Sequence, residues 1–333
     1  MKYIFSIGTE HQLFQVDIAI KHFNISVSEV VLAVENNHKS NGFIDEIQKS
    51  PDYGQVIVFE SWTFRDIIKN PAKHNAFTTW CSSLDGADIS FFYSHYSDDS
   101  TLLFLSKVRP SKSYLMDEGT ASFRVVMQRR ENSFKLKMKL ALKSLLYGQY
   151  LKILPSITYF TQFDIDLPKE DGKELYRPEK KINEPLAIID GELIYLGTSI
   201  TELGIIDENI YLGFMRKIVT DNRGRISRFY YYSHRKESKS KLDKIVLMGF
   251  EIVELDEPFE KFFLKQKSIA TLICSLSTTN ILYNLVNTAV CHPDLLMYKI
   301  NHDLLDNSKI IYDDIFAATT QKTKEIVVKE IVG

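Results

Sequence analysis

Apolar strand-like runs alternate with helix-like segments twice along this chain, and that alternation most constrains its fold. In the first half we expect strands at 3–7, 27–34, 56–59, 89–93, 102–104 and 112–116, with helices at 12–23, 41–49 and 63–69 between them. The alternation restarts in the second half, with strands expected at 193–196, 228–233, 244–246, 251–253 and 269–274, and helices at 207–219 and 258–265. Alternation of this kind predicts parallel sheets covered by helices. The expected class is therefore α/β, with two Rossmann-like domains.

The length and one proline-rich stretch indicate where the two domains divide. A chain of 333 residues exceeds the size at which a single core keeps growing. Charged residues and three prolines are concentrated between residues 161 and 185, which is typical of a linker. We expect a first domain at 1–160, a second at 186–305 and a C-terminal helical segment at 306–333. A helix at 322–329 should close the chain.

Composition and charge exclude several classes of protein. The formal net charge is −2, so the chain lacks the overall positive field typical of nucleic-acid binding. Its three cysteines are widely spaced and form no CxxC pair, which argues for a reducing compartment and against a zinc site. The first apolar run is too short for a signal peptide, and no stretch of about 20 apolar residues occurs. We therefore expect a cytoplasmic protein.

The sequence Asp117-Glu118-Gly119 directly follows an apolar, β-prone run. Its glycine can adopt backbone conformations closed to other residues, so the chain can turn sharply and leave a carboxylate at a strand end. On its own, such a tripeptide is more often a surface turn.

Two further groups of polar side chains follow expected strands in the second half. His234 stands where the strand at 228–233 should end, which is the ligand-binding edge of an open α/β sheet, and an imidazole there can act as a general acid. The alternative is a surface histidine in a basic loop. Ser277-Thr278-Thr279 follows a strand and begins a helix, where hydroxyls and backbone amides can hold a phosphate or act only as a helix cap.

Three other positions complete the candidate site. Gly197-Thr198-Ser199 forms a second strand-to-helix turn that can approach the same ligand. Glu260, at a helix start, can accept hydrogen bonds from ribose hydroxyls or can simply stabilise the helix dipole. Gly8-Thr9 lies at the first strand-to-helix turn, but no GxGxxG dinucleotide motif follows it.

Three other motifs are interpreted as unrelated to the site. His292-Pro293 comes after the hydroxyl cluster, on a segment expected to pass from helix to loop. Asp164-Ile165-Asp166 matches a metal-binding DxD motif but lies in the expected linker, so we interpret it as surface. Asp98-Asp99 is interpreted as a turn between strands.

In this order and at these separations, Asp117-Glu118-Gly119, His234-Arg235-Lys236-Glu237 and Ser277-Thr278 resemble the motifs of the bacterial family 52 sialyltransferases. These enzymes modify lipooligosaccharide and capsule. Tyr195-Leu196-Gly197 and Pro258-Phe259-Glu260 resemble two further elements of that family. The chain departs from the family at Arg235, where the family has proline.

The resemblance implies a GT-B fold, in which the two Rossmann-like domains face a cleft, and inverting transfer of sialic acid or a related nonulosonic acid from a CMP-sugar. The first domain would be the acceptor side and the second would bind the CMP donor. Asp117 would be the base, with Glu118 as the alternative, and His234 the acid. The donor would contact Gly197, Thr198, Ser199, Glu260, Ser277 and Thr278, and the acceptor side would include Gly8 and Thr9.

The implied partners are a CMP-sugar and a glycan or glycolipid acceptor such as a terminal galactose, with no metal and no further cofactor. Another GT-B transferase, using a hexosyl or Kdo donor, and a non-catalytic carbohydrate-binding protein are the alternatives. A basic stretch, residues 124–143, could approach an anionic membrane. The sequence also leaves open peripheral attachment to the inner face of the plasma membrane and a homodimer.

Overall fold

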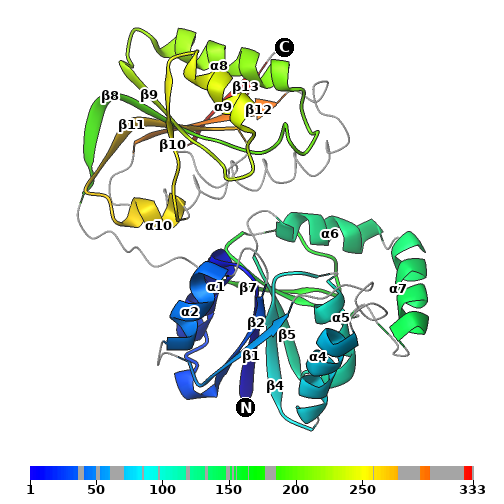
Figure 1. Ribbon diagram of the computed structural model, residues 1–333. Coiled ribbons are helices and arrows are strands. Elements are labelled where there is room, and N and C mark those ends of the chain that lie inside the picture. Colours follow the sequence, from blue (N-terminus) through cyan, green and yellow to red (C-terminus); the bar gives the residue numbers. More distant parts are fainter. Residues whose placement is uncertain are drawn as a thin grey trace. The chain divides into compact units, whose positions relative to one another are not determined.

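The computed structural model describes residues 1–36, 41–49, 53–60, 71–84, 86–96, 98–117, 121–131, 134–147, 151, 154, 156–163, 165–176, 185–257, 259–276, 293–300 and 326–331. The chain divides into two compact units, Met1–Tyr176 and Arg177–Gly333. Each unit is built around one sheet (Figure 1).

Unit 1 contains a seven-stranded sheet in the order β3-β2-β1-β4-β5-β6-β7, with every neighbouring pair parallel. The strands are β1 (Lys2–Ile7), β2 (Val30–Asn36), β3 (Gln55–Glu60), β4 (Ile89–Tyr93), β5 (Lys112–Met116), β6 (Thr158–Thr161) and β7 (Gly172–Leu175). The chain runs outward from β1 on one side and from β4 on the other. The point between β1 and β4 is therefore the topological switch point, where open α/β sheets bind ligands.

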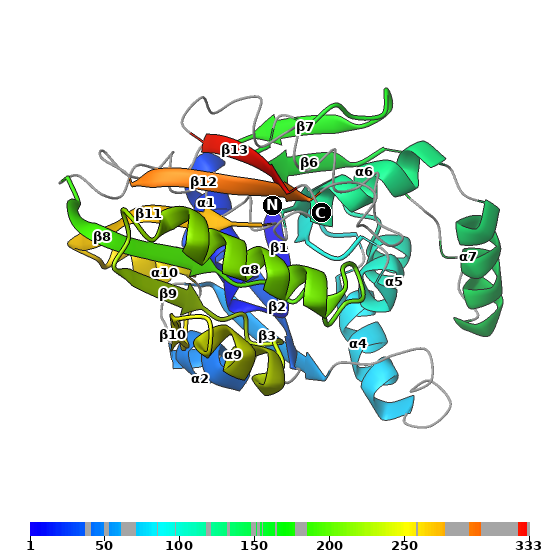
Figure 2. The same cartoon turned by 90° about the horizontal axis from the view of Figure 1, so that it is seen from above.

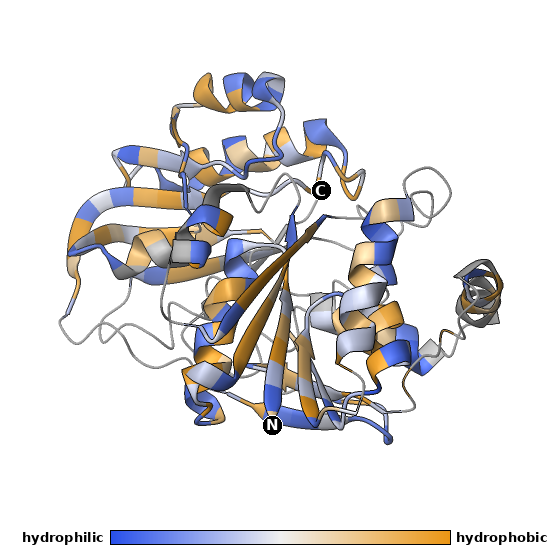
Figure 3. Cartoon of the chain, turned by 60° about the horizontal axis from the view of Figure 1, so that its bottom comes forward, coloured by the Kyte–Doolittle hydropathy of each residue, from blue (hydrophilic) through white to orange (hydrophobic). Residues whose placement is uncertain are grey.

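Helices cover both faces of this sheet, as Figures 1 and 3 show for α1 and α2 on one side and α4 and α5 on the other. The helices are α1 (Glu10–His22), α2 (Asn41–Lys49), α4 (Pro71–Ser83), α5 (Asp99–Val108), α6 (Ala121–Glu131) and α7 (Phe134–Tyr147), and a 3-10 turn, η1 (Val27–Glu29), precedes β2. Alternate residues of each strand serve the two faces. Phe92 of β4 stacks on Phe5 at 4.4 Å on the α1 side, whereas its neighbour Phe91 stacks on Phe104 of α5 at 4.1 Å. The central strands are mostly hydrophobic in Figure 3, as strands buried on both faces must be.

Unit 2 contains a six-stranded parallel sheet in the order β10-β9-β8-β11-β12-β13. The strands are β8 (Ala187–Leu196), β9 (Arg228–Tyr232), β10 (Phe250–Val253), β11 (Ser268–Ser275), β12 (Asp294–Ile300) and β13 (Ile326–Ile331). Numbered from β8, this is the 3-2-1-4-5-6 order of a Rossmann sheet, with its switch point between β8 and β11.

Two separate cores hold the helices of unit 2 on its sheet. The helices α8 (Glu208–Asn222) and α9 (Lys239–Val246) pack on the face that carries Tyr195 and Tyr231. The short helix α10 (Phe259–Leu264) packs on the opposite face, against Ile194 and Ile273. Figure 1 shows α8 and α10 on opposite sides of the strands. The prediction of an α/β chain with two Rossmann-like domains, the construction of the GT-B class, is confirmed.

The expected C-terminal helix is wrong. Residues 326–331 form β13, which pairs in parallel with β12 from Leu295↔Ile326 to Ile300↔Ile331. Three consecutive β-branched residues, Ile326 to Val328, favour a strand over a helix. The second domain therefore does not end at 305, because its sheet includes β13.

The expected end of the first domain at 160 is also too early. Residues 172–175 lie inside the expected linker, yet they form β7 and pair with β6 from Thr158↔Gly172 to Thr161↔Leu175. The units divide after Tyr176. Prolines and charges in this stretch indicated a loop, but an edge strand of four residues needs no apolar pattern.

Two short expected strands are helical. Residues 102–104 lie within α5. Asp98 caps the start of this helix, because its side chain accepts a hydrogen bond from the backbone N–H of Ser100. Asp98-Asp99 is thus a helix start rather than a turn between strands. Residues 244–246 end α9, whose cap is Ser238. Short apolar runs do not distinguish a strand from a buried helical turn.

Among the described residues, no helix is long and apolar enough to cross a membrane.

Candidate functional site

In unit 2, two turns meet where β8 and β9 end. The first runs from Gly197 to Glu202 after β8, and the second runs from Ser233 to Ser238 after β9. The backbone N–H of Gly197 donates to the carbonyl oxygen of Tyr232 at 2.8 Å, so the two strand ends are joined. Both turns lie at the carboxyl edge beside the switch point, where a ligand is expected.

Only glycine fits at the start of the first turn. A Cβ atom on residue 197 would lie 2.5 Å from the Oε2 atom of Glu237 and 2.8 Å from the carbonyl oxygen of Tyr232. A contact of 2.8 Å with backbone cannot be relieved by rotating a side chain. The role of Gly197 in bringing the turns close together is therefore steric.

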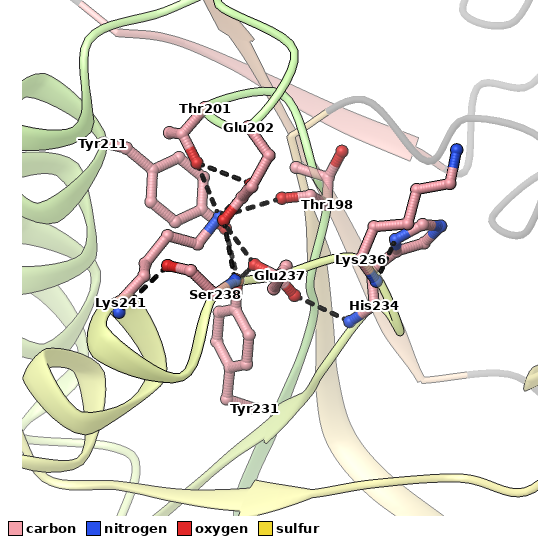
Figure 4. Close-up of polar contacts among 10 residues, drawn as sticks. All are labelled: Thr198, Thr201, Glu202, Tyr211, Tyr231, His234, Lys236, Glu237, Ser238 and Lys241. Atoms are coloured by element: carbon pink, nitrogen blue, oxygen red, sulfur yellow. Dashed lines mark hydrogen bonds and ion pairs between the residues drawn. The ribbon is translucent and has the colours of Figure 1, made fainter.

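One buried lysine ties the two turns together (Figure 4). The side chain of Lys241, in the first turn of α9, is 0% exposed. Its Nζ atom lies 2.8 Å from Oε1 of Glu237 and 3.1 Å from Oε2 of Glu202. It also donates to the Thr198 carbonyl oxygen at 3.1 Å and to the Thr201 hydroxyl at 2.8 Å. We call this group of Lys241, Glu237 and Glu202 the lysine clamp.

The lysine clamp stabilises the charged form of the Glu237 carboxylate, which burial alone would disfavour. Burial raises the pKa of Glu237, while hydrogen bonds from Lys241 and Tyr231 act against that shift. The Tyr231 hydroxyl donates to Oε1 of Glu237 at 2.5 Å and lies 2.7 Å from the Tyr211 hydroxyl. The Lys241 ammonium lies 4.6 Å from the centre of the Tyr211 ring. Paired charges and hydrogen bonds of this kind fix a single geometry rather than adding net stability.

His234 is exposed, and the clamp holds its backbone. Its backbone N–H donates to Oε2 of Glu237 at 2.6 Å, while its Nδ1 atom accepts from the backbone N–H of Lys236 at 3.3 Å. Since that N–H can only donate, Nδ1 carries the lone pair and the neutral ring carries its proton on Nε2. Partial desolvation and the nearby cations of Arg235 and Lys236 lower the pKa of His234. In this geometry the ring is a hydrogen-bond donor through Nε2.

Arg235 and Lys236 add positive charge to the same turn. Both side chains are exposed, and both are near enough to His234 to act on its charge. The turn between β9 and α9 therefore presents an imidazole N–H and two cations, a set of groups that suits a phosphate.

The other predicted donor residues are only partly described. Ser199 is buried and Thr198 half-buried in the first turn. Glu260 is the second residue of α10, so it stands at a helix start as expected, but its side chain lies outside the described part. Ser277 and Thr278 lie outside the described residues, as does Glu118 of the first domain.

In unit 1, Asp117 directly follows β5 and is fully buried, with 0% exposure. Its Oδ1 atom accepts from the Ser122 hydroxyl at 2.5 Å, and its Oδ2 atom accepts from the backbone N–H of Gln162 at 2.9 Å. The Tyr176 hydroxyl lies 3.5 Å from Oδ2. Burial raises the pKa of Asp117 to about 6, although these hydrogen bonds oppose the shift. A carboxylate with such a pKa can accept a proton near neutral pH.

Gly8 and Thr9 follow β1 at the same edge of the sheet. Thr9 caps α1 by accepting from the backbone N–H of Gln12 at 3.3 Å, and the Gly8 N–H donates to Oε1 of Gln12 at 2.6 Å. The amide nitrogen of Gln12 lies 3.3 Å from Nδ1 of His95, which is exposed beyond β4. Strands β1, β4 and β5 are neighbours, so Gly8, His95 and Asp117 share one edge.

The structure brings some predicted residues together and leaves others apart. Gly197, Thr198 and His234 meet in unit 2, whereas Gly8 and Asp117 share an edge of unit 1. Asp117 and His234 belong to different units, so their joint action stays a prediction.

Of the motifs set aside, Asp166 is 97% exposed beside Arg130, as the surface interpretation predicts. Asp164 and His292 lie outside the described residues. However, the segment after His292 is strand β12 rather than helix and loop.

Four residues of these two sites were not predicted from the sequence: Lys241, Glu202, Gln12 and His95. The only local signal for the clamp is the i,i+4 spacing of Glu237 and Lys241, which usually marks an exposed pair on a helix. Burial of that pair depends on Tyr211 and on the turn after β8, and neither is adjacent in sequence.

Comparison with known proteins gives structural likeness only. No family model and no curated protein matches the chain. Among solved structures, Acinetobacter baumannii MurG is similar over 99% of this chain and 86% of its own, at 8% identity and a TM-score of 0.48. Phytolacca americana UGT2, complexed with UDP-2-fluoro-glucose and pterostilbene, is similar over 96% of this chain and 90% of its own, at 9% identity and a TM-score of 0.48. The E. coli heptosyltransferase WaaC with ADP is similar over 100% of this chain and 94% of its own, at 11% identity and a TM-score of 0.41.

Proposed function

We propose that this chain is an inverting glycosyltransferase that moves sialic acid, or a related nonulosonic acid, from a CMP-sugar to a glycan hydroxyl. The observation that carries the proposal is the lysine clamp, which holds two strand-end turns in one geometry beside the switch point of the second sheet. Burying a charged network such as this one costs desolvation free energy. Such a network is typical of a site whose ligand-binding groups must be held in one geometry before the ligand arrives.

The donor would bind unit 2. Its single phosphate would meet Nε2–H of His234, with Ser277 and Thr278 as the further predicted contacts. The lowered pKa of His234 favours hydrogen bonding to the phosphate over proton donation in the unliganded protein. A bound phosphate, being an anion, would raise that pKa again and would permit the acid role.

The acceptor would be activated by Asp117. In the reaction, the acceptor oxygen forms a bond to the anomeric carbon, the bond from that carbon to the CMP phosphate breaks, and the hydroxyl proton passes to the base. A carboxyl with a pKa of about 6 suits that step. Oδ1 and Oδ2 of Asp117 already accept hydrogen bonds, so the step requires one of these contacts to give way when the acceptor binds.

The remaining parts of the proposal come from the family resemblance. They are a glycan or glycolipid acceptor ending in galactose and independence from metal and other cofactors. The proposed cytoplasmic site of action rests instead on the cysteine usage and the short first apolar run, and the sequence leaves a homodimer open.

The decisive experiment incubates the full chain with CMP-sialic acid and a galactose-terminated acceptor, with and without EDTA, and measures CMP release and the sialylated product. Product formation that survives EDTA supports the proposal. Hydrolysis of the donor without transfer, or no CMP release at all, contradicts it.

One observation favours a second candidate, a transferase that uses a nucleoside diphosphate sugar. Arg235 and Lys236 supply two exposed cations beside His234, more positive charge than a single phosphate requires. A diphosphate donor would use that additional charge. Thermal shift measured with CMP, UDP, GDP and ADP separates the two candidates, because stabilisation by a diphosphate but not by CMP would favour the second.

A further inference from the structure

Among the residues that the structure describes, the exposed face of α7 carries the largest side-by-side group of exposed apolar side chains, and the packing of unit 1 does not use them. Met138, Leu142 and Leu145 are 58%, 60% and 79% exposed. With 3.6 residues per turn, these positions lie within about 60° of one another around the helix axis. They therefore form one continuous apolar stripe, and exposed stripes of this kind mark interaction sites.

The opposite side of α7 attaches the helix to the rest of unit 1. Leu140 is buried, and Lys143 forms an ion pair with Asp99 at the start of α5. The Ser144 hydroxyl accepts from the backbone N–H of Leu151 at 2.8 Å. These contacts fix which face points outward. Figures 1, 2 and 3 all show α7 at the periphery of unit 1, away from its sheet.

The charge of α7 indicates what covers the stripe. The helix sequence FKLKMKLALKSLLY contains four lysines and no acidic residue. Lys143 is used by Asp99, and Lys135, Lys137 and Lys139 occupy the first half of the helix. A helix with an apolar stripe and same-sign basic flanks lies in the interface of an anionic bilayer, where the apolar side chains enter the acyl boundary and lysines reach the headgroups.

We propose that α7 docks unit 1 on an anionic lipid surface through Met138, Leu142 and Leu145. The surface is distinct from the candidate site, and the proposal does not depend on which sugar the protein transfers. A second copy of the chain is a less suitable occupant, because two helices of the same positive charge would then repel each other.

The test is co-sedimentation of the full chain with vesicles of phosphatidylcholine alone and of phosphatidylcholine with phosphatidylglycerol. The wild type is expected to bind the anionic vesicles and to be released by salt, since such attraction is screened within about a Debye length. The triple variant Met138→Gln, Leu142→Gln, Leu145→Gln should bind at least tenfold more weakly. Replacing Lys135, Lys137 and Lys139 by Gln should weaken binding by about fivefold per lysine.

The matched control replaces two exposed apolar residues of unit 2, Val246→Gln and Leu247→Gln, which are 48% and 86% exposed. This variant should bind like the wild type, and circular dichroism should show all variants folded. Equal binding of the α7 triple variant and the wild type overturns the proposal, as does equal binding to neutral and anionic vesicles. A wild type that does not bind vesicles but sediments as a dimer, with a monomeric triple variant, assigns the stripe to self-association instead.

Discussion

The candidate sites of unit 1 and unit 2 each contain a buried carboxylate at a strand edge, but the two carboxylates have different partners. In unit 2 the Glu237 carboxylate is paired with the Lys241 ammonium at 2.8 Å, and both side chains are 0% exposed. In unit 1 the Asp117 carboxylate is equally buried, but the partners described above are neutral donors from Ser122 and Gln162. Burial raises the pKa of both carboxylates, but at Glu237 the paired ammonium opposes that shift and fixes the turn, whereas the hydrogen-bond donors described for Asp117 are neutral and its pKa is raised to about 6. We therefore expect Glu237 to hold the ligand-binding turns of unit 2 in place and Asp117 of unit 1 to take part in proton transfer.

The largest expected effect comes from breaking the pair in unit 2. Lys241→Met leaves two carboxylates, Glu237 and Glu202, without their cation, and removal of one partner from a buried pair costs about 3–5 kcal/mol of unfolding free energy. Urea unfolding followed by circular dichroism measures the loss. Lys244→Met is the control on the same helix, because its pair with Glu208 is exposed and should contribute at most about 1 kcal/mol.

A double variant sharpens this result. Adding Glu237→Gln to Lys241→Met removes one of the two unpaired charges, the fully buried one, and should recover part of the lost stability. If the single and double variants are equally unstable, the clamp acts through packing alone, and the electrostatic half of the comparison is wrong.

Asp117→Asn should lower turnover about 100-fold or more while leaving donor binding nearly intact, because a positioned base contributes on that scale. Single-turnover kinetics together with calorimetric CMP binding separates the two quantities. At the paired site we expect a different pattern, in which Glu237→Gln weakens donor binding as well as turnover. Loss of CMP affinity in Asp117→Asn would contradict the division of roles.

The same variant has a pH signature. The pKa of Asp117 is raised from 3.8 to about 6 in the folded state, so the stability linked to it is complete below pH 3.8 and is lost as the pH rises through 6. Asp117→Asn removes this dependence. Relative to the wild type it should gain up to about 3 kcal/mol between pH 4 and pH 7, measured by urea unfolding at each pH. A flat difference across that range would show that the carboxyl titrates normally.

His234→Ala should weaken CMP binding and reduce turnover by about 10- to 100-fold, the scale of one lost hydrogen bond to a charged group. The effect should be smaller than that of Asp117→Asn, because the predicted contacts of Ser277 and Thr278 with the phosphate would remain. His292→Ala is the matched control and should have little effect. If His292→Ala abolishes activity and His234→Ala is tolerated, the donor site has to be rebuilt around the start of β12.

The smallest effect is expected at the helix cap of unit 1. Thr9→Ala removes the side-chain oxygen that accepts from Gln12 and should cost about 1 kcal/mol by thermal unfolding. Activity should change little if Thr9 only orders the turn. A loss of activity much larger than the loss of stability would place Thr9 in contact with the acceptor.

The sequence contained enough information for both sheets and for several strand-end positions. Strands buried on both faces read as apolar runs, so Gly197, His234 and Asp117 were placed at their ends correctly. The partners of these residues could not be predicted, because Lys241 meets the turn after β8 and Asp117 meets Gln162 only through tertiary contacts. The helix expected at 322–329 was wrong. Lys322 and Lys324 next to an apolar run suggested an amphipathic helix, but that run belongs to strand β13.

The order of the strands in each sheet also bears on how the chain reaches its fold. In both sheets the first strand made, β1 or β8, becomes central, and every later strand pairs with one that already exists. A chain emerging from the ribosome can therefore assemble each sheet from the middle outward, because every new strand finds its partner already synthesised. The central strand waits longest for its second partner, because β1 ends at Ile7 while β4 begins at Ile89, and β8 ends at Leu196 while β11 begins at Ser268. During synthesis, the second edges of β1 and β8 are then the most open to mispairing with another chain, and β4 and β11 are the strands that end that exposure.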